Sequence, residues 1–170
     1  WIHESKNADS VASDAARAVQ AARAAPGGVS TLILPADTAW NEARRAEQKL
    51  PDLLPAPVSP DAIDAAARLL SNGKKTALLL RGAALYGAGL EAAGRVQAKT
   101  GARLLCDTFA PHAELGAGRV PVERIPYFAE QIVDFLQDFE QIIFVGAKPP
   151  VSFFAYPGKP SWCVPEGATI

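Results

Sequence analysis

The chain has 170 residues, 49% of them hydrophobic, and a formal net charge of -1 at pH 7. This length suffices for one well-packed domain, or for one domain plus part of another. The near-neutral balance gives no basic surface for nucleic acid or an anionic membrane, and the apolar runs are far too short to span a bilayer. The amino terminus lacks the features of a signal peptide. Because the chain contains no Met, we expect Trp1 to be an internal residue of a longer protein.

The first 50 residues predict a helix followed by a strand. Apolar side chains recur at helical spacing in residues 8–25, on a face formed by Val11, Ala15, Ala18, Val19 and Ala22. The apolar run 31–34, ended by Pro35, predicts a strand covered on both faces, as strands of parallel sheets usually are. We expect most of its sheet to come from residues that would precede Trp1, with the first residues frayed. A short helix is expected at 41–48.

Four prolines then mark a boundary, at Pro51, Pro55, Pro57 and Pro60. Proline fixes φ and has no N–H group, so this stretch is predicted to be an extended linker. The expected organisation is a first domain at 1–50, a linker at 51–59 and a second domain at 60–170.

Helices and strands alternate regularly after this linker. Helices are expected at 60–71, 86–100 and 125–139, and buried strands at 76–82, 102–107, 141–148 and 161–164. This alternation predicts an α/β domain with three layers around a parallel, Rossmann-like sheet, preceded by the partial α/β segment.

Few residues point to chemistry on their own. The turn "RGAALYGAG" at 81–89 has the glycines of a phosphate loop but neither the Walker nor the dinucleotide spacing, so a tight strand-to-helix turn is favoured. His112 lies near Asp107 and Glu114, and such pairs can exchange protons, but a solvated loop histidine is the simpler interpretation. We therefore predict no catalytic residue.

The aromatic and sulfur-bearing side chains leave two further expectations. Phe153, Phe154, Tyr156 and Trp162 either line a pocket, such as an adenine slot, or form an interface with a partner, which we favour. Cys106 and Cys163 lie among apolar residues without metal-type spacing, which predicts buried thiols in a reducing cytoplasm and no metal site.

Several stretches together resemble the thiamine diphosphate-dependent enzymes, in the acetolactate synthase large subunit-like and benzoylformate decarboxylase-like group. They are "GGVSTLILPADTAWNEA" at 27–43, "AIDAAARLLSNGKKTALLLRG" at 62–82, "GARLLCDTFAPHAELGAGRVPVERIPYF" at 101–128 and "EQIIFVGAKPP" at 140–150. The resemblance covers the whole chain in order. It implies that residues 1–50 end a pyrimidine-binding domain, and that residues 60–170 form most of the central Rossmann-like domain, incomplete at its C-terminal end.

The resemblance also implies a parent enzyme that decarboxylates 2-oxo acids with thiamine diphosphate and magnesium, and in synthase-like members transfers the product group. The family's Gly-Asp-Gly motif, which holds the metal and diphosphate, is absent from this chain, and its catalytic glutamate would lie before Trp1. The chain is therefore expected to supply scaffold and subunit contacts and to be inactive alone. Its expected partners are the missing N- and C-terminal domains of the same polypeptide, in a homodimer or homotetramer.

Some family members bind FAD or an adenine nucleotide on the central domain. Gly146 and Ala147 match the start of the "GARFDDR"-like stretch of FAD-binding members, but Lys148 to Pro150 depart from it, which argues against FAD. Gly82 and Gly146 follow predicted strands, where such folds bind ligands, and are candidates for contacting an adenine nucleotide. A freestanding nucleotide-binding module is thus the alternative function, and an interaction domain recruiting a partner through residues 1–37 is a third.

Overall fold

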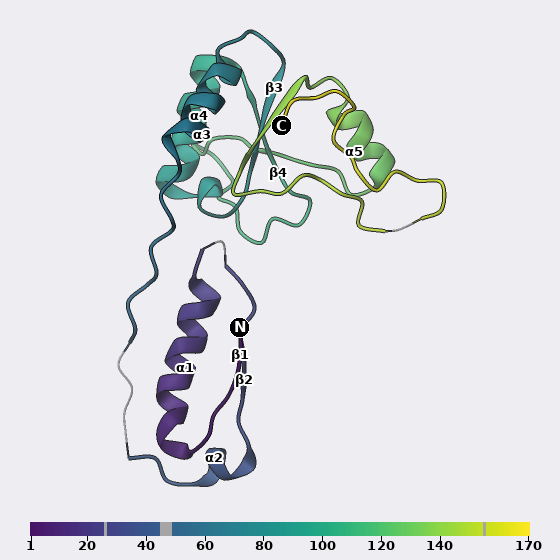
Figure 1. The fold of residues 1–170 in the computed structure, drawn as a ribbon. Helices are drawn as coiled ribbons and strands as arrows, with labels where there is room; N and C mark the ends of the chain where they lie inside the picture. The colour runs from purple at the N-terminus through teal and green to yellow at the C-terminus, as the bar shows by residue number, and fades with distance from the viewer. Residues whose placement is uncertain (26, 45–48, 155) are drawn as a thin grey trace. The chain divides into compact units, whose positions relative to one another are not determined.

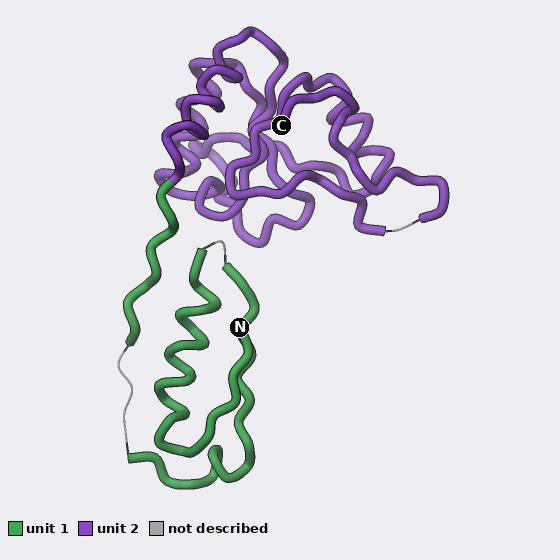
Figure 2. The backbone as a smooth tube through the Cα atoms, in the orientation of Figure 1, with its two compact units in different colours: residues 1–57 green, residues 58–170 purple. Residues whose placement is uncertain are grey.

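The computed structural model describes residues 1–25, 27–44, 49–154 and 156–170. The chain divides into two compact units, Trp1–Pro57 and Val58–Ile170 (Figure 2). This division falls inside the proline-rich stretch, and every residue from 51 to 59 is exposed and lies outside helices and strands.

The first unit is a short β–α–β arrangement followed by a single helical turn. Its elements are β1 (Ile2–Glu4), α1 (Ala8–Arg23), β2 (Thr31–Ile33) and α2 (Ala36–Trp40). The two strands pair in parallel, with Ile2 opposite Thr31, and α1 runs beside them (Figure 1). The Asn7 side chain caps α1 by accepting a hydrogen bond from the Ser10 amide. The helix predicted at 8–25 and the strand predicted at 31–34 are both present, each slightly shorter.

Three expectations for this unit need correction. The first residues are not frayed, because they form β1. The strand β2 is not covered on both faces, since Ile33 is 46% exposed and a two-stranded sheet with one long helix leaves much of its surface bare. The helix expected at 41–48 does not start there: the structure has α2, which ends at Trp40, and residues 41–44 are not helical. Residues 45–48 lie outside the described residues.

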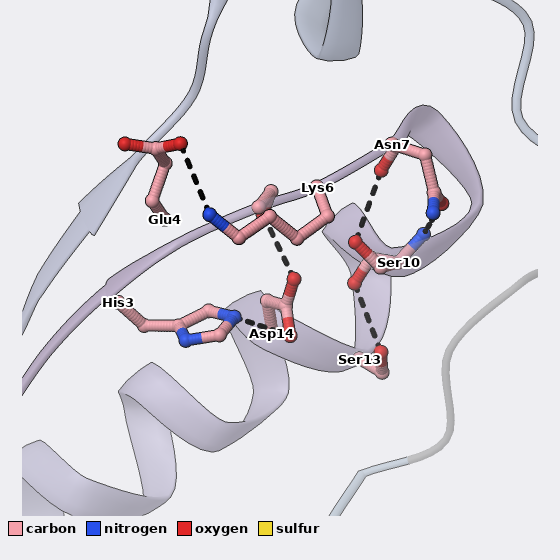
Figure 3. A network of polar contacts seen from close by, with 8 residues as sticks. His3, Glu4, Lys6, Asn7, Ser10, Ser13 and Asp14 are labelled. Carbon is pink, nitrogen blue, oxygen red and sulfur yellow. Dashed lines mark hydrogen bonds and ion pairs between the residues drawn. The ribbon is translucent and has the colours of Figure 1, made fainter.

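A buried carboxylate joins β1 to α1 (Figure 3). Asp14 of α1 is 4% exposed. The Ser5 hydroxyl donates a hydrogen bond of 2.9 Å to its Oδ2, and Nε2 of His3 lies 3.2 Å from its Oδ1. Burial by itself would raise the pKa of Asp14, but hydrogen bonds from Ser5 and Ser10 and the contact with His3 outweigh burial and hold this pKa below its ordinary value.

We expect the stability of the first unit to fall in acid because of Asp14. The pKa of Asp14 is lower in the folded state than in the unfolded state, where it is about 3.9. The ionised carboxylate therefore stabilises the fold fully above about pH 3.9. This stabilisation is lost as the pH falls through the folded-state pKa. Asp14→Asn should remove this acid dependence and cost about 2 kcal/mol at pH 7.

Urea unfolding between pH 7 and pH 2, followed by Trp1 and Trp40 fluorescence in a Trp162→Phe background, tests this expectation. Asp37→Asn is the matched control, because Asp37 is an exposed aspartate of the same unit and should leave the acid dependence unchanged. An Asp14→Asn variant with the wild-type acid profile would contradict the assignment.

The second unit is a three-layer α/β fold, as predicted. Its sheet has the order β5-β4-β3-β6, all parallel, with strands β3 (Thr76–Leu80), β4 (Arg103–Cys106), β5 (Glu123–Arg124) and β6 (Gln141–Val145). The helices α3 (Pro60–Leu70) and α4 (Gly87–Thr100) lie on one side of this sheet and α5 (Ala129–Leu136) on the other (Figure 1). A short 3-10 helix, η1 (Gly82–Leu85), joins β3 to α4.

Alternating residues of the central strands fill the two interfaces. Ala77 and Leu79 pack in the cluster beneath α5, with Leu105, Ile132 and Ile142. Their neighbours Leu78 and Leu80 pack in the opposite cluster, with Leu85, Ala93 and Leu104. Because both faces are covered, β3 is buried along its whole length, which explains its uninterrupted apolar sequence.

Local sequence signals place the helix ends of this unit. Ser59 caps α3 by accepting a hydrogen bond from the Ala62 amide, and Pro60 occupies the first turn. Gly101 ends α4 with a φ of 75°, which favours glycine. The expected apolar face of α3 is present but poorly covered, since Ile63 is 57% exposed.

Three features of this unit differ from prediction. The helix expected at 125–139 is shortened to α5, and Phe128 is its N-cap residue. The strand β5 lies between the elements expected at 102–107 and 125–139, where no strand was predicted. Residues 161–164 do not form a strand. Trp162 makes a single antiparallel bridge with Val151, and the adjacent Cys163 is buried in the cluster beneath α5. No described helix is long and apolar enough to cross a membrane.

Candidate ligand-binding site

The parallel strands of the second unit bring four loops to one edge of the sheet. Arg81 follows β3, Asp107 follows β4, Ile125 follows β5 and Gly146 follows β6. The chain adds β4 and β5 on one side of β3 and then returns to place β6 on its other side. Folds of this kind bind ligands outside the carboxyl ends of the strands, where the strand order reverses.

A cavity of about 350 Å³ opens at this edge. Its apolar lining comes from loops after three strands and from one turn of α5. The lining residues are Arg81, Asp107, Thr108, Phe109, Ile125, Tyr127, Ile132, Lys148, Pro149, Pro150, Val151, Ser152 and Phe153. A mainly apolar cavity with a few converging polar groups is the usual form of a small-molecule site.

An ion pair crosses this edge from β3 to β4. Nη1 of Arg81 lies 2.6 Å from Oδ2 of Asp107, and the Arg81 side chain remains 47% exposed. Lys148 adds a second cationic side chain to the cavity lining. Two cations and one carboxylate give the lining a net charge of +1, opposite in sign to the net charge of the chain.

Aromatic rings form one wall of the cavity. The ring centroids of Phe109 and Phe153 are 5.1 Å apart. The ring centroid of Tyr127 lies 5.6 Å from that of Phe109 and 5.9 Å from that of Phe153. Phe154 and Tyr156, with Phe153, line a neighbouring cavity of about 180 Å³. Of the four aromatic residues singled out in the sequence, Phe153 therefore reaches the larger cavity, whereas Trp162 lines neither.

The two predicted glycine positions flank the cavity without lining it. Gly82 begins η1 with a φ of 59°, and Gly146 follows β6 with a φ of 69°. A Cβ atom at position 146 would lie 3.1 Å from the Arg81 carbonyl oxygen, so glycine allows the loop after β6 to pass close to the loop after β3. These glycines shape the edge, while the neighbouring Arg81 and Lys148 line it.

The structure does not assemble an acid–base pair at His112. Asp107 pairs with Arg81, and Glu114 lies 3.0 Å from Nη1 of Arg119. The exposed His112 ring instead contacts Tyr86, with centroids 5.0 Å apart. The simpler interpretation, a solvated loop histidine, is the one that the structure supports.

Both cysteines are free and buried, as predicted. Burial raises the pKa of the Cys106 thiol and that of the Cys163 thiol, which disfavours the reactive thiolate. Among the described residues, no three His, Cys, Asp or Glu side chains gather closely enough to hold a metal ion. The described residues therefore offer no set of side chains that fits the magnesium ion implied by the family resemblance, and no catalytic step is assigned to them.

Sequence and structure comparisons relate the chain to known enzymes. No protein-family model matches it. It is 40% identical over 170 residues to the acetolactate synthase large subunit-like protein IlvX of Mycobacterium tuberculosis, a match that covers all of this chain and 32% of the relative. The chain thus spans about a third of the length of this curated relative.

Solved structures agree with this match in fold. The thiamine diphosphate-dependent 4-hydroxybenzoylformate decarboxylase of Rhodococcus jostii RHA1 aligns with a TM-score of 0.68 at 20% identity, over 99% of this chain and 32% of that one. Benzoylformate decarboxylase from Polynucleobacter necessarius aligns with a TM-score of 0.62 at 22% identity, over 98% and 31% of the two chains. The chain is thus similar in sequence, over its whole length, to part of an acetolactate synthase large subunit-like relative, and it shares its fold with part of two thiamine diphosphate-dependent decarboxylases.

Proposed function

We propose that this chain is part of a thiamine diphosphate-dependent enzyme that acts on 2-oxo acids, of the acetolactate synthase-like or decarboxylase-like kind. Residues 1–50 would end its pyrimidine-binding domain, 51–59 would form the linker, and 60–170 would form most of its central domain. The 40% identity to the acetolactate synthase large subunit-like relative over the entire chain is the observation that carries this proposal.

The role proposed for these residues is scaffold and subunit contact, without activity of their own. Two observations support it. The sequence contains no Gly-Asp-Gly motif, and the carboxylates of Asp107 and Glu114 are paired with Arg81 and Arg119. The complete protein would be a cytoplasmic homodimer or homotetramer that uses thiamine diphosphate and magnesium.

The test compares the 170-residue chain with the full polypeptide encoded by its gene. Both are assayed for carbon dioxide release from pyruvate and from benzoylformate, with thiamine diphosphate and magnesium present. We expect turnover by the full polypeptide and none by the chain alone. Turnover by the isolated chain would overturn the scaffold role, and a full polypeptide that neither binds thiamine diphosphate nor releases carbon dioxide would overturn the enzyme assignment.

A freestanding adenine-nucleotide-binding module is the second candidate. The cavity at the carboxyl edge favours it, because Arg81 and Lys148 lie beside the glycine turns at positions 82 and 146. Calorimetric titration with ADP is the test: saturable binding by the 170-residue chain with a dissociation constant below about 0.1 mM would support it, and no binding at 5 mM would exclude it.

A further inference from the structure

The cavity at the carboxyl edge has a composition that discriminates among ligands. Its apolar part includes Ile125 and Ile132, from the α5 side of the sheet, and the three consecutive residues Pro149, Pro150 and Val151. The half-buried prolines and the exposed Val151 favour an apolar ligand body, because covering them removes apolar area from water. At about 350 Å³, the cavity lies at the small end of ligand sites.

The aromatic wall of the cavity is only partly covered by protein. The Phe109 side chain is 56% exposed and Phe153 is 61% exposed, although their rings contact each other and Tyr127. A planar ring placed against this wall would gain offset or edge-to-face contacts as well as burial. The wall therefore favours an aromatic ligand over a saturated one of the same size.

The charged groups favour a single negative charge on that ligand. Arg81 carries five N–H donors, and its hydrogen bond to Asp107 uses Nη1 alone. The planar guanidinium fork matches a carboxylate, and Lys148 can add a point charge. Since the lining carries a net charge of +1, a monocarboxylate would neutralise it, whereas a diphosphate would leave a large excess of negative charge in a partly apolar site.

We propose that this cavity is a binding site for a small monocarboxylate bearing an aromatic ring. The carboxylate is held by Arg81 and Lys148, and the ring lies against Phe109, Tyr127 and Phe153. The site is built entirely within the Val58–Ile170 unit, so its occupancy does not depend on the activity of a complete enzyme. The ligand class proposed here differs from the adenine nucleotide considered above for the same cavity.

Three matched probes test the proposal on the 170-residue chain. Phenylacetate should bind with a dissociation constant of about 1 mM or tighter, measured by chemical-shift changes in 15N-labelled protein. Phenylacetamide, which has the same shape without the charge, should bind at least about 10-fold more weakly. Cyclohexylacetate, which has the charge without the aromatic ring, should bind several-fold more weakly.

Variants locate the binding to this cavity. Lys148→Gln and Phe153→Leu each change an exposed side chain and should keep the fold, as circular dichroism would verify, while weakening phenylacetate by about 5-fold. Lys99→Gln is the control, because Lys99 is an exposed lysine in the last turn of α4 and should leave binding unchanged. Equal affinity for phenylacetate and phenylacetamide, or no loss in the Lys148 and Phe153 variants, would overturn the proposal. Absence of phenylacetate binding at 10 mM would overturn it as well, whether or not ADP binds.

Discussion

Leu79→Ala is expected to lower the free energy of unfolding of the Val58–Ile170 unit by about 3 kcal/mol. Leu79 is 1% exposed and lies in β3, the strand between β4 and β6. Its side chain belongs to the cluster beneath α5, with Leu105 and Ile132. Truncation removes the transfer free energy of the side chain and leaves a cavity, because strands bonded on both sides cannot move inward to fill it.

The measurement is urea unfolding of variants in which Trp1 and Trp40 are replaced by phenylalanine, so that Trp162 reports on this unit alone. Leu115→Ala is the control: Leu115 is a loop leucine that is 65% exposed, and its truncation should cost no more than about 0.5 kcal/mol. Similar losses in the two variants would contradict the placement of Leu79 at the centre of the core.

The elements that the sequence predicted well are those with a strong local pattern. The buried strands β3, β4 and β6 appear as short apolar runs because helices cover both faces of their sheet. The end of helix α4 was predicted because the residue that follows it, Gly101, adopts the left-handed backbone conformation that glycine favours. Such signals need no knowledge of distant residues, and together they determine a three-layer α/β fold.

The missed elements depend on partners that are distant in the chain. The strand β1 exists because residues 2–4 pair with residues 31–33, and β5 because Glu123 and Arg124 pair with the end of β4. Neither segment has enough apolar residues to be identified alone. Arg103 strengthens the β4–β5 edge by bonding Glu123 while lying over the rings of Phe135 and Phe139, a contact between three elements that no local pattern reveals.

The sequence pointed to glycines at this edge of the sheet but not to the side chains that line the cavity. Gly82 and Gly146 follow β3 and β6 at the edge where the cavity opens, and their contact with a ligand stays a prediction. The residues that line the cavity there include Phe109 and Tyr127, from loops after β4 and β5. Asp107 illustrates the difficulty, since its nearness in sequence to His112 suggested an acid–base pair, whereas the parallel register of β3 and β4 places it beside Arg81.

Replacing Gln141 with leucine is expected to cost about 2 kcal/mol, although leucine has nearly the same volume and is more apolar. Gln141 opens β6 and is 1% exposed. Its Nε2 donates hydrogen bonds to the Thr76 hydroxyl at 2.8 Å and to Oδ1 of Asn72 at 3.0 Å. Its Oε1 accepts one from Nδ2 of Asn72 at 2.7 Å. A leucine removes these hydrogen bonds and leaves the buried Thr76 hydroxyl without the amide that donates to it, and this cost exceeds the gain from burying an apolar side chain.

A double-mutant cycle separates this network from the general effect of altering β6. Gln141→Leu and Asn72→Ala should together cost less than the sum of the two single variants, because both remove the same pair of hydrogen bonds. Gln131→Leu, at an exposed position of α5, should change the free energy of unfolding by no more than about 0.5 kcal/mol. Additive losses would show that the two amides act independently. The coupled result would mean that one buried glutamine holds the end of α3 against the first residues of β3 and β6, at the edge of the sheet opposite the cavity.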